Sequence, residues 1–197
     1  PVFSADGTRA SRTTKLYNPT TGEHTTRLTV VDTATGAVLG SPIVVDGEAG
    51  DFVQSKDGTR VGLTTEKYDE ATETYTTTVV IVDAATGAVV GTRFVIEAQR
   101  ASHLQLNEDG TRAFQATQTF VDADRKWFTE ITVIDTTSGT LVATPIVLDG
   151  SFRIHSNNQI HPQALVFNAD GSRAFVHTQN LGSGVDATQP EKTYVAV

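Results

Sequence analysis

The sequence predicts an all-β fold, a β-propeller of about four four-stranded antiparallel blades whose last blade is incomplete. Two phrases recur in register, and apolar residues alternate with a period of two. The first phrase, SADGTR in its first copy, has its Asp-Gly pair at Asp6, Asp57, Asp109 and Asp170. The second phrase follows three of these copies, as VVDTATGAVLG, IVDAATGAVVG and VIDTTSGTLVA. Short strands that recur at about 50 residues are typical of propeller blades.

The second repeat shows the expected strands most clearly. In TYTTTVVIVD the apolar side chains point alternately to two faces, which is the pattern of a strand. Glycine or threonine interrupts almost every stretch long enough for a helix, so no helix is expected. The strands predicted in this repeat cover 51–55, 59–68, 75–83 and 88–97. The repeats are predicted at 1–51, 52–103, 104–164 and 165–197, within one propeller domain or segment.

The Asp-Gly pairs are predicted to close tight turns between the first and second strands of each blade. Glycine takes a positive φ at little steric cost, so Gly7, Gly58, Gly110 and Gly171 should all adopt one. The Ser or Asn two residues before each Asp can bond the turn backbone. A calcium site needs roughly six to eight clustered oxygens, and one carboxylate per turn falls far short. We therefore expect these turns to be structural.

The third strand of each blade should bury one side against the next blade. Equivalent positions in the repeats carry pairs of aliphatic residues, which we expect in the core between blades. The pairs are Leu28 and Val30, Val79 and Ile81, Ile131 and Val133, and Val195 and Val197.

Composition excludes several classes of partner and site. A net charge of −8 repels a phosphate backbone, and the 15 basic residues are scattered singly, so nucleic acid is not an expected partner. No apolar run approaches the roughly 18 residues that span a bilayer, so no membrane insertion is expected. Cysteine is absent, which excludes disulfides and thiolate metal ligands. No phosphate-binding loop, dinucleotide fingerprint or nucleophile elbow occurs, and no cofactor is expected.

The phrases FSADGTRA, VVDTATGAVLG and IVDAATGAVVG resemble the YVTN-type bacterial β-propeller repeat. The resemblance covers nearly the whole chain and implies a propeller in a secreted or cell-surface bacterial protein. The repeats here are longer than those of that family. The excess falls mainly in the second hairpin of each blade, at 17–26, 68–75 and 120–127.

The long hairpins and the connections between blades are predicted to share one face, where the copies differ most. The third connection carries an insertion that lengthens the last spacing. Trp127 adjoins a hairpin tip and aligns with Tyr75 in the repeat. The two residues either form an aromatic patch that binds a glycan or a protein, or they support the base of the hairpin. The candidate binding residues on this face are Glu48, Asp51, Glu97, Arg100, His103, Trp127, Arg153, His155 and His161.

These residues favour a non-catalytic module that binds a protein or a glycan. The resemblance to the YVTN class, whose related propellers include lactonases and other hydrolases, implies the alternative of a propeller hydrolase. Its candidate residues would be Asp51, Glu97, His103 and His161. A zinc site of His103, His155 and His161 is geometrically conceivable, but these loop histidines have no acidic residue at ligand spacing, so no metal is expected. His24 and His177 are read as plain strand positions.

The ends of the chain suggest that further surface is covered in the native protein. About four blades are too few for the usual closed ring, and an open propeller exposes a blade face. We expect the chain to be a fragment of a longer propeller or to pair with a second copy of itself.

Overall fold

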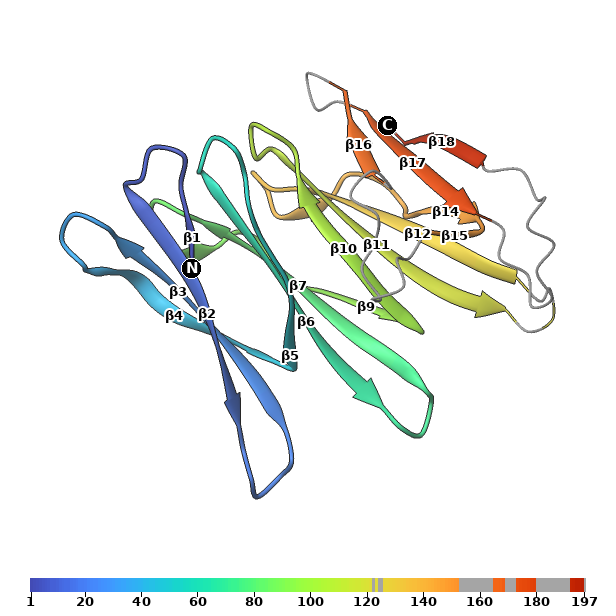
Figure 1. Ribbon diagram of the computed structural model, residues 1–197, viewed down its shortest axis with the longest axis horizontal. Coiled ribbons are helices and arrows are strands. Elements are labelled where there is room, and N and C mark those ends of the chain that lie inside the picture. The colour runs from blue at the N-terminus through green and yellow to red at the C-terminus, as the bar shows by residue number, and fades with distance from the viewer. Residues whose placement is uncertain (122, 124–125, 153–164, 169–172, 180–191, 197) are drawn as a thin grey trace.

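The chain forms four antiparallel sheets that stand side by side in chain order (Figure 1). The computed structural model describes residues 1–121, 123, 126–152, 165–168, 173–179 and 192–196. The first sheet contains β1 (Val2–Phe3), β2 (Arg9–Tyr17), β3 (His24–Asp32) and β4 (Val38–Asp46). The second contains β5 (Glu48–Gln54), β6 (Arg60–Asp69), β7 (Thr74–Asp83), β8 (Ala88–Val89) and β9 (Phe94–Ala98). The third contains β10 (Arg100–Leu106), β11 (Arg112–Val121), β12 (Lys126–Asp135), β13 (Thr140–Leu141) and β14 (Ile146–Asp149). The fourth contains β15 (Ser151–Phe152), β16 (Leu165–Phe167), β17 (Ala174–Gln179) and β18 (Lys192–Ala196).

Each of the first three sheets is a meander of the kind that makes a propeller blade, and the predicted all-β propeller is confirmed. The outer strand is continuous in the first blade, but it is divided into β8 and β9 in the second and into β13 and β14 in the third. In the fourth sheet, β15 and β16 both pair with one edge of β17 and β18 pairs with it as well. Within the described part of the chain, no helix is long and apolar enough to cross a membrane.

The Asp-Gly turns have the conformation that the sequence predicts. Gly7, Gly58 and Gly110 have φ values of 68°, 75° and 67°, whereas Gly171 lies outside the described residues. In the first copy, the N–H of Gly7 donates to the Ser4 carbonyl at 2.8 Å, and the Ser4 hydroxyl accepts from the N–H of Arg9 at 2.9 Å. The backbone N–H of Thr8 also binds Asp6 and, with the Ser4 and Thr8 hydroxyls, holds the pKa of that carboxyl below its ordinary value. The turn is therefore closed by its own side chains.

An ion pair joins the two recurring phrases within each of the first three blades. The Nη1 of Arg9 lies 2.7 Å from Oδ2 of Asp32, so the arginine of the first phrase meets the aspartate of the second. The equivalent distances are 2.8 Å for Arg60 and Asp83 and 2.6 Å for Arg112 and Asp135. This contact fixes the register of the second strand against the third. It explains why the two phrases recur together.

The core lies between neighbouring blades, as predicted from the third strands. Leu28 and Val30 of the first blade pack with Val61 and Leu63 of the second, and all four are buried. Equivalent residues of the second blade pack against the third, and those of the third against the fourth. The prediction is confirmed for the pairs Leu28 and Val30, Val79 and Ile81, and Ile131 and Val133. The side chains of Val195 and Val197 lie outside the described residues.

The connections between blades are shorter than predicted. Gly47 alone separates β4 from β5, and Gln99 and Gly150 hold the same place at the next two boundaries. The N–H of Gly47 donates to the carbonyl of His24 at 2.8 Å, which ties the link to the first blade. Residues such as Glu48, expected in a loop, therefore extend the inner strand of the next blade.

The inner strands are irregular at one position, and the insertion of the fourth repeat falls there. The ladder of β5 shifts register between Ala49 and Phe52, and β10 shifts at the corresponding position. In the fourth sheet the corresponding position lies between Phe152 of β15 and Leu165 of β16, so the inserted residues 153–164 fall there in the sequence. The insertion thus interrupts an inner strand, because β15 already belongs to the fourth sheet. The expectation that the insertion lies in the connection before that sheet is therefore wrong.

The face of the first blade that no described sheet covers is more polar than its interior counterparts. Arg12 is exposed there, whereas the second blade buries Leu63 at the equivalent position. Thr29 of the first blade likewise occupies the position at which the second blade has the buried Val80. This face lacks the central aliphatic pair that joins the interior blades.

Candidate binding cleft

A cleft of about 430 Å³ lies where the hairpins of the first two blades meet. Its walls are the start of β3, the link at Gly47, the last residues of β6 and the first residues of β7. Both hairpins extend downward from the sheets in Figure 1. The cleft is lined by Gly22, Glu23, His24, Thr25, Asp46, Gly47, Glu48, Glu66, Lys67, Tyr68, Glu70 and Tyr75.

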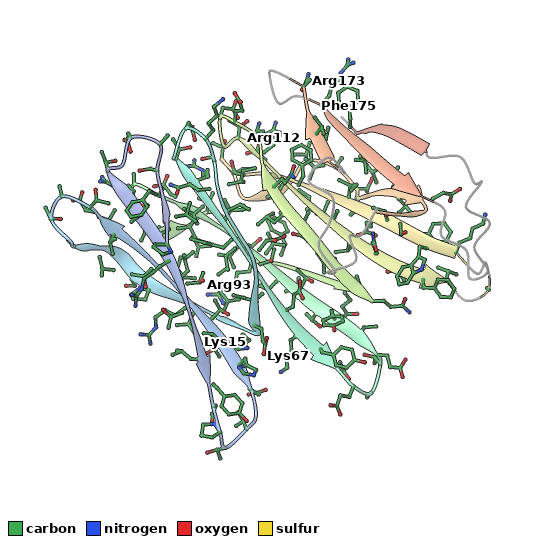
Figure 2. All side chains as sticks on the ribbon, in the orientation of Figure 1. Lys15, Lys67, Arg93, Arg112, Arg173 and Phe175 are labelled. Carbon is green, nitrogen blue, oxygen red and sulfur yellow. The ribbon has the colours of Figure 1, made fainter. Side chains whose placement is uncertain are left out.

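Ion pairs between the first two blades hold the sides of the cleft. Oε1 of Glu48 lies 2.6 Å from Nζ of Lys15 and 3.1 Å from Nε2 of His24. Nζ of Lys67 lies 3.0 Å from Oε1 of Glu23, and Figure 2 labels both lysines near the lower ends of their strands. The hydrogen bond from Lys15 lowers the pKa of Glu48, and that from Lys67 lowers the pKa of Glu23. Because these pairs are exposed, they set the position of the hairpins more than they stabilise the fold.

Glu66 is a half-buried carboxyl at the base of the cleft. Burial raises the pKa of Glu66 above its ordinary value, and the neighbouring carboxylates of Asp51 and Glu48 raise it further. The backbone beside it has no room for a side chain. A β-carbon at Gly50 would lie 2.6 Å from Oγ1 of Thr64 and 3.2 Å from Oε1 of Glu66. Glycine at position 50 is therefore what lets this carboxyl pack against the inner strand.

We expect Glu66→Gln to raise the thermal unfolding midpoint at neutral pH. A carboxyl whose pKa is raised by folding stabilises the fold below its unfolded value of about 4.3, and that contribution is lost as the pH rises through the folded value. The glutamine removes the charge that folding disfavours at neutral pH, so the gain should disappear in acid. Thermal unfolding followed by circular dichroism between acid and neutral pH measures this. Glu70→Gln, at an exposed residue of the same cleft, is the control, and an equal gain from it would contradict the burial argument.

Aromatic side chains form a pair at the base of each of the three long hairpins. Ring centroids are 4.8 Å apart for Tyr17 and His24, 4.8 Å for Tyr68 and Tyr75, and 5.4 Å for Phe120 and Trp127. Members of each pair are directly opposite one another on neighbouring strands and hold the same register in each blade. Such cross-strand pairs stabilise a hairpin. Tyr17 and Tyr68 are nevertheless 58% and 48% exposed, so these rings also present surface to a ligand.

Asp51 joins the second blade to the third. It lies in the bulge of β5, and its Oδ2 accepts a hydrogen bond of 2.7 Å from the backbone N–H of Leu104. Leu104 follows the equivalent bulge of β10, where His103 holds the position of Asp51. A carboxylate that accepts a hydrogen bond from a backbone N–H in an irregular strand has a structural role. Asp51 therefore connects neighbouring inner strands.

The structure separates the predicted site residues into several places. Glu48 reaches the cleft, Trp127 belongs to the third aromatic pair, and Glu97 is exposed on β9. Arg100 and His103 lie in β10, but their side chains are outside the described part. Predictions for Arg153, His155 and His161 also fall outside the described residues. Among the residues that the structure describes, no group of three or more His, Asp and Glu is arranged to hold a metal ion.

Some residues in the cleft and beside it were not predicted from the sequence. His24 was read as a plain strand position, yet its ring contacts Tyr17 and its Nε2 faces Glu48. Lys15 was not singled out at all. The available signal was alignment of the hairpins, because His24 occupies the position of Tyr75 and Trp127 in the other repeats.

Comparison with known proteins identifies the fold. No family model matches the chain, and no curated protein matches it. The β-propeller domain of the trilobed protease from Pyrococcus furiosus, described as an open velcro topology, superposes with a TM-score of 0.54 at 12% identity, over 97% of this chain and 52% of that one. An acylaminoacyl peptidase from Pyrococcus horikoshii gives a TM-score of 0.55 at 13% identity, over 96% of this chain and 30% of that one. This chain is therefore similar to part of each, and the likeness is one of fold.

A more distant likeness is to an enzyme of another kind. A putative 6-phosphogluconolactonase from Bacteroides fragilis gives a TM-score of 0.33 at 14% identity, over 98% of this chain and 81% of that one. Superposition at that level carries no argument about activity. The chemistry of this chain has to be inferred from the cleft itself.

Proposed function

We propose that the chain is a non-catalytic binding module that recognises a glycan or a protein at the cleft between its first two blades. The observation that supports this is the lining of the cleft, where members of two aromatic pairs stand among carboxylates. Aromatic faces and a few charged groups in a concave surface are typical of ligand sites. The volume, about 430 Å³, lies within the usual range for such sites.

The contacts of the charged groups favour binding over catalysis. Glu48, Glu23 and Lys67 are each engaged in an ion pair, and Asp51 binds a backbone N–H. A general acid or base needs a partner group within hydrogen-bond reach of a reacting atom. Glu66 has a raised pKa, but no described nucleophile stands beside it with an orienting base. The lactonase-like alternative is therefore retained only as an outcome of the test.

The test is a screen of the purified chain against immobilised glycans and peptides, run beside a hydrolysis screen with lactones and esters. Binding that is lost in Tyr68→Ala and kept in Glu108→Gln would support the proposal. Glu108 is a suitable control because it lies at the opposite, turn-bearing end of the blades and pairs with Lys56. Turnover of a lactone or ester without any binding partner would replace the proposal with the hydrolase. Circular dichroism checks that each variant is folded.

The location and assembly of the chain belong to the same proposal. The recurring phrases support a YVTN-type repeat of a secreted or cell-surface bacterial protein, in which this chain is part of a longer propeller or pairs with a second copy. The longer propeller is proposed first, and the face around Arg12 would meet either kind of partner with polar side chains in place of an aliphatic pair. Light scattering at micromolar concentration tests this, and a stable dimer would reverse the preference.

A further inference from the structure

We propose that the cleft binds a glycan that carries protonated amino groups, with sugar rings against the aromatic pairs and ammonium groups against the carboxylates. This rests on the proposed function and names its ligand class. Two independent features of the described residues carry it. They are the aromatic surfaces on both sides of the cleft and the excess of carboxylates between them.

The aromatic pairs supply flat surfaces at a repeated position. His24, from the first pair, and Tyr68 and Tyr75, from the second, all line the cleft. The apolar face of a pyranose ring packs on such side chains, and the tyrosine hydroxyl provides a hydrogen-bond partner beside the ring. Because the pair recurs in each blade at the same register, a second sugar unit meets equivalent surface on the next blade, at Phe120 and Trp127. A chain of sugars fits this repetition better than a single compact ligand.

The charges select the type of glycan. Five lining residues are carboxylates, whereas Lys67 is the one lysine or arginine in the lining of this cleft, and Lys15 adjoins it. Both lysines already pair with Glu23 and Glu48. Among the described residues, Asp46 and Glu70 form no close ion pair like those of Glu23 and Glu48, although Asp46 lies near enough to Lys67 to help raise the pKa of that lysine. The cleft therefore repels an acidic sugar and attracts an amine.

The buried carboxyl agrees with this preference. Glu66 faces the carboxylates of Glu48 and Asp51 on β5, with Lys67 next to it in the chain and Lys15 and His24 held by Glu48. Burial makes its ionisation unfavourable, and neighbouring negative charge adds to this effect. A bound ammonium group would relieve that repulsion. Binding should consequently weaken in acid, as the carboxyls of the cleft become protonated.

The experiment compares two ligands of the same length and linkage. Isothermal titration calorimetry of the whole chain, at about pH 6 where the amines are largely protonated and exposed Asp and Glu are ionised, is run with a β-1,4-linked glucosamine tetramer and with its N-acetylated counterpart. We expect the amine to bind at least about tenfold more tightly and to lose affinity as salt rises, because exposed charges are screened. Asp46→Asn with Glu70→Gln should reduce its affinity by about tenfold, and Glu108→Gln should not.

The outcomes separate this inference from the proposed function. Equal binding of both tetramers, insensitive to salt and to the paired substitution, would overturn the amine preference while leaving a glycan-binding module. Binding of neither tetramer would also overturn it, and the glycan and peptide screen would then decide the broader proposal on its own. A thermal unfolding curve for each variant ensures that lost binding does not reflect a lost fold.

Discussion

Replacing Gly87 by alanine is expected to destabilise the protein by about 3 to 5 kcal/mol, the sum of backbone strain and a clash with the neighbouring blade. Gly87 lies in the turn after β7 with φ at +68°, a conformation that costs an L-residue about 1–2 kcal/mol. A β-carbon there would also collide with the carbonyl of Leu39 in the outer strand of the first blade. The obstacle is backbone, so it cannot turn aside as a side chain would.

Gly36→Ala is the matched control. Gly36 holds the equivalent turn position in the first blade with φ at +71°, but a β-carbon there would have nothing within 4 Å. Only the strain remains, and the loss should be about 1–2 kcal/mol. Chemical denaturation of both variants measures the difference. Equal losses would mean that the turns do not hold neighbouring blades together.

The turns could be predicted from the sequence because their cause is local. An Asp-Gly pair between strands requires a positive φ whatever surrounds it, and Gly7, Gly58 and Gly110 all adopt one. The burial of the third strands could be predicted from the sequence as well. Alternation of period two and repetition of the aliphatic pairs both reflect faces that each blade must cover.

The connections and the cleft could not be predicted, because they depend on how strands pair within a blade and on contacts between blades. Whether Glu48 lies in a loop or a strand is decided by its pairing with Glu66 on the neighbouring strand, 18 residues further along the chain. Its approach to Lys15 depends on the angle between two sheets. The interruption at 153–164 is likewise set by the register of β15 against β17, which the spacing of repeats does not reveal. The recognisable part of the site was the aromatic residue at each hairpin base.

Leu63→Ala should cost about 3 to 5 kcal/mol, because its side chain is fully buried between the first two blades. Leu63 is 0% exposed and belongs to the cluster that contains Leu28, Val30 and Val80. The loss combines the missing transfer energy with the cavity left behind, and strands held in register within each blade by ion pairs have little freedom to close that cavity. Chemical denaturation gives the change in unfolding free energy.

Leu141→Ala removes the same atoms from an exposed position and is the control. Leu141 is 44% exposed in the short outer strand of the third blade, so its truncation should cost less than about 1 kcal/mol. Because the cleft lies between the same two blades that Leu63 joins, its truncation is further expected to weaken ligand binding at temperatures where the variant remains folded. Equal effects of the two leucines on stability would show that the first two blades do not depend on their shared core. In that case the cleft between them would have to be held by the ion pairs of Glu48 and Lys67 instead.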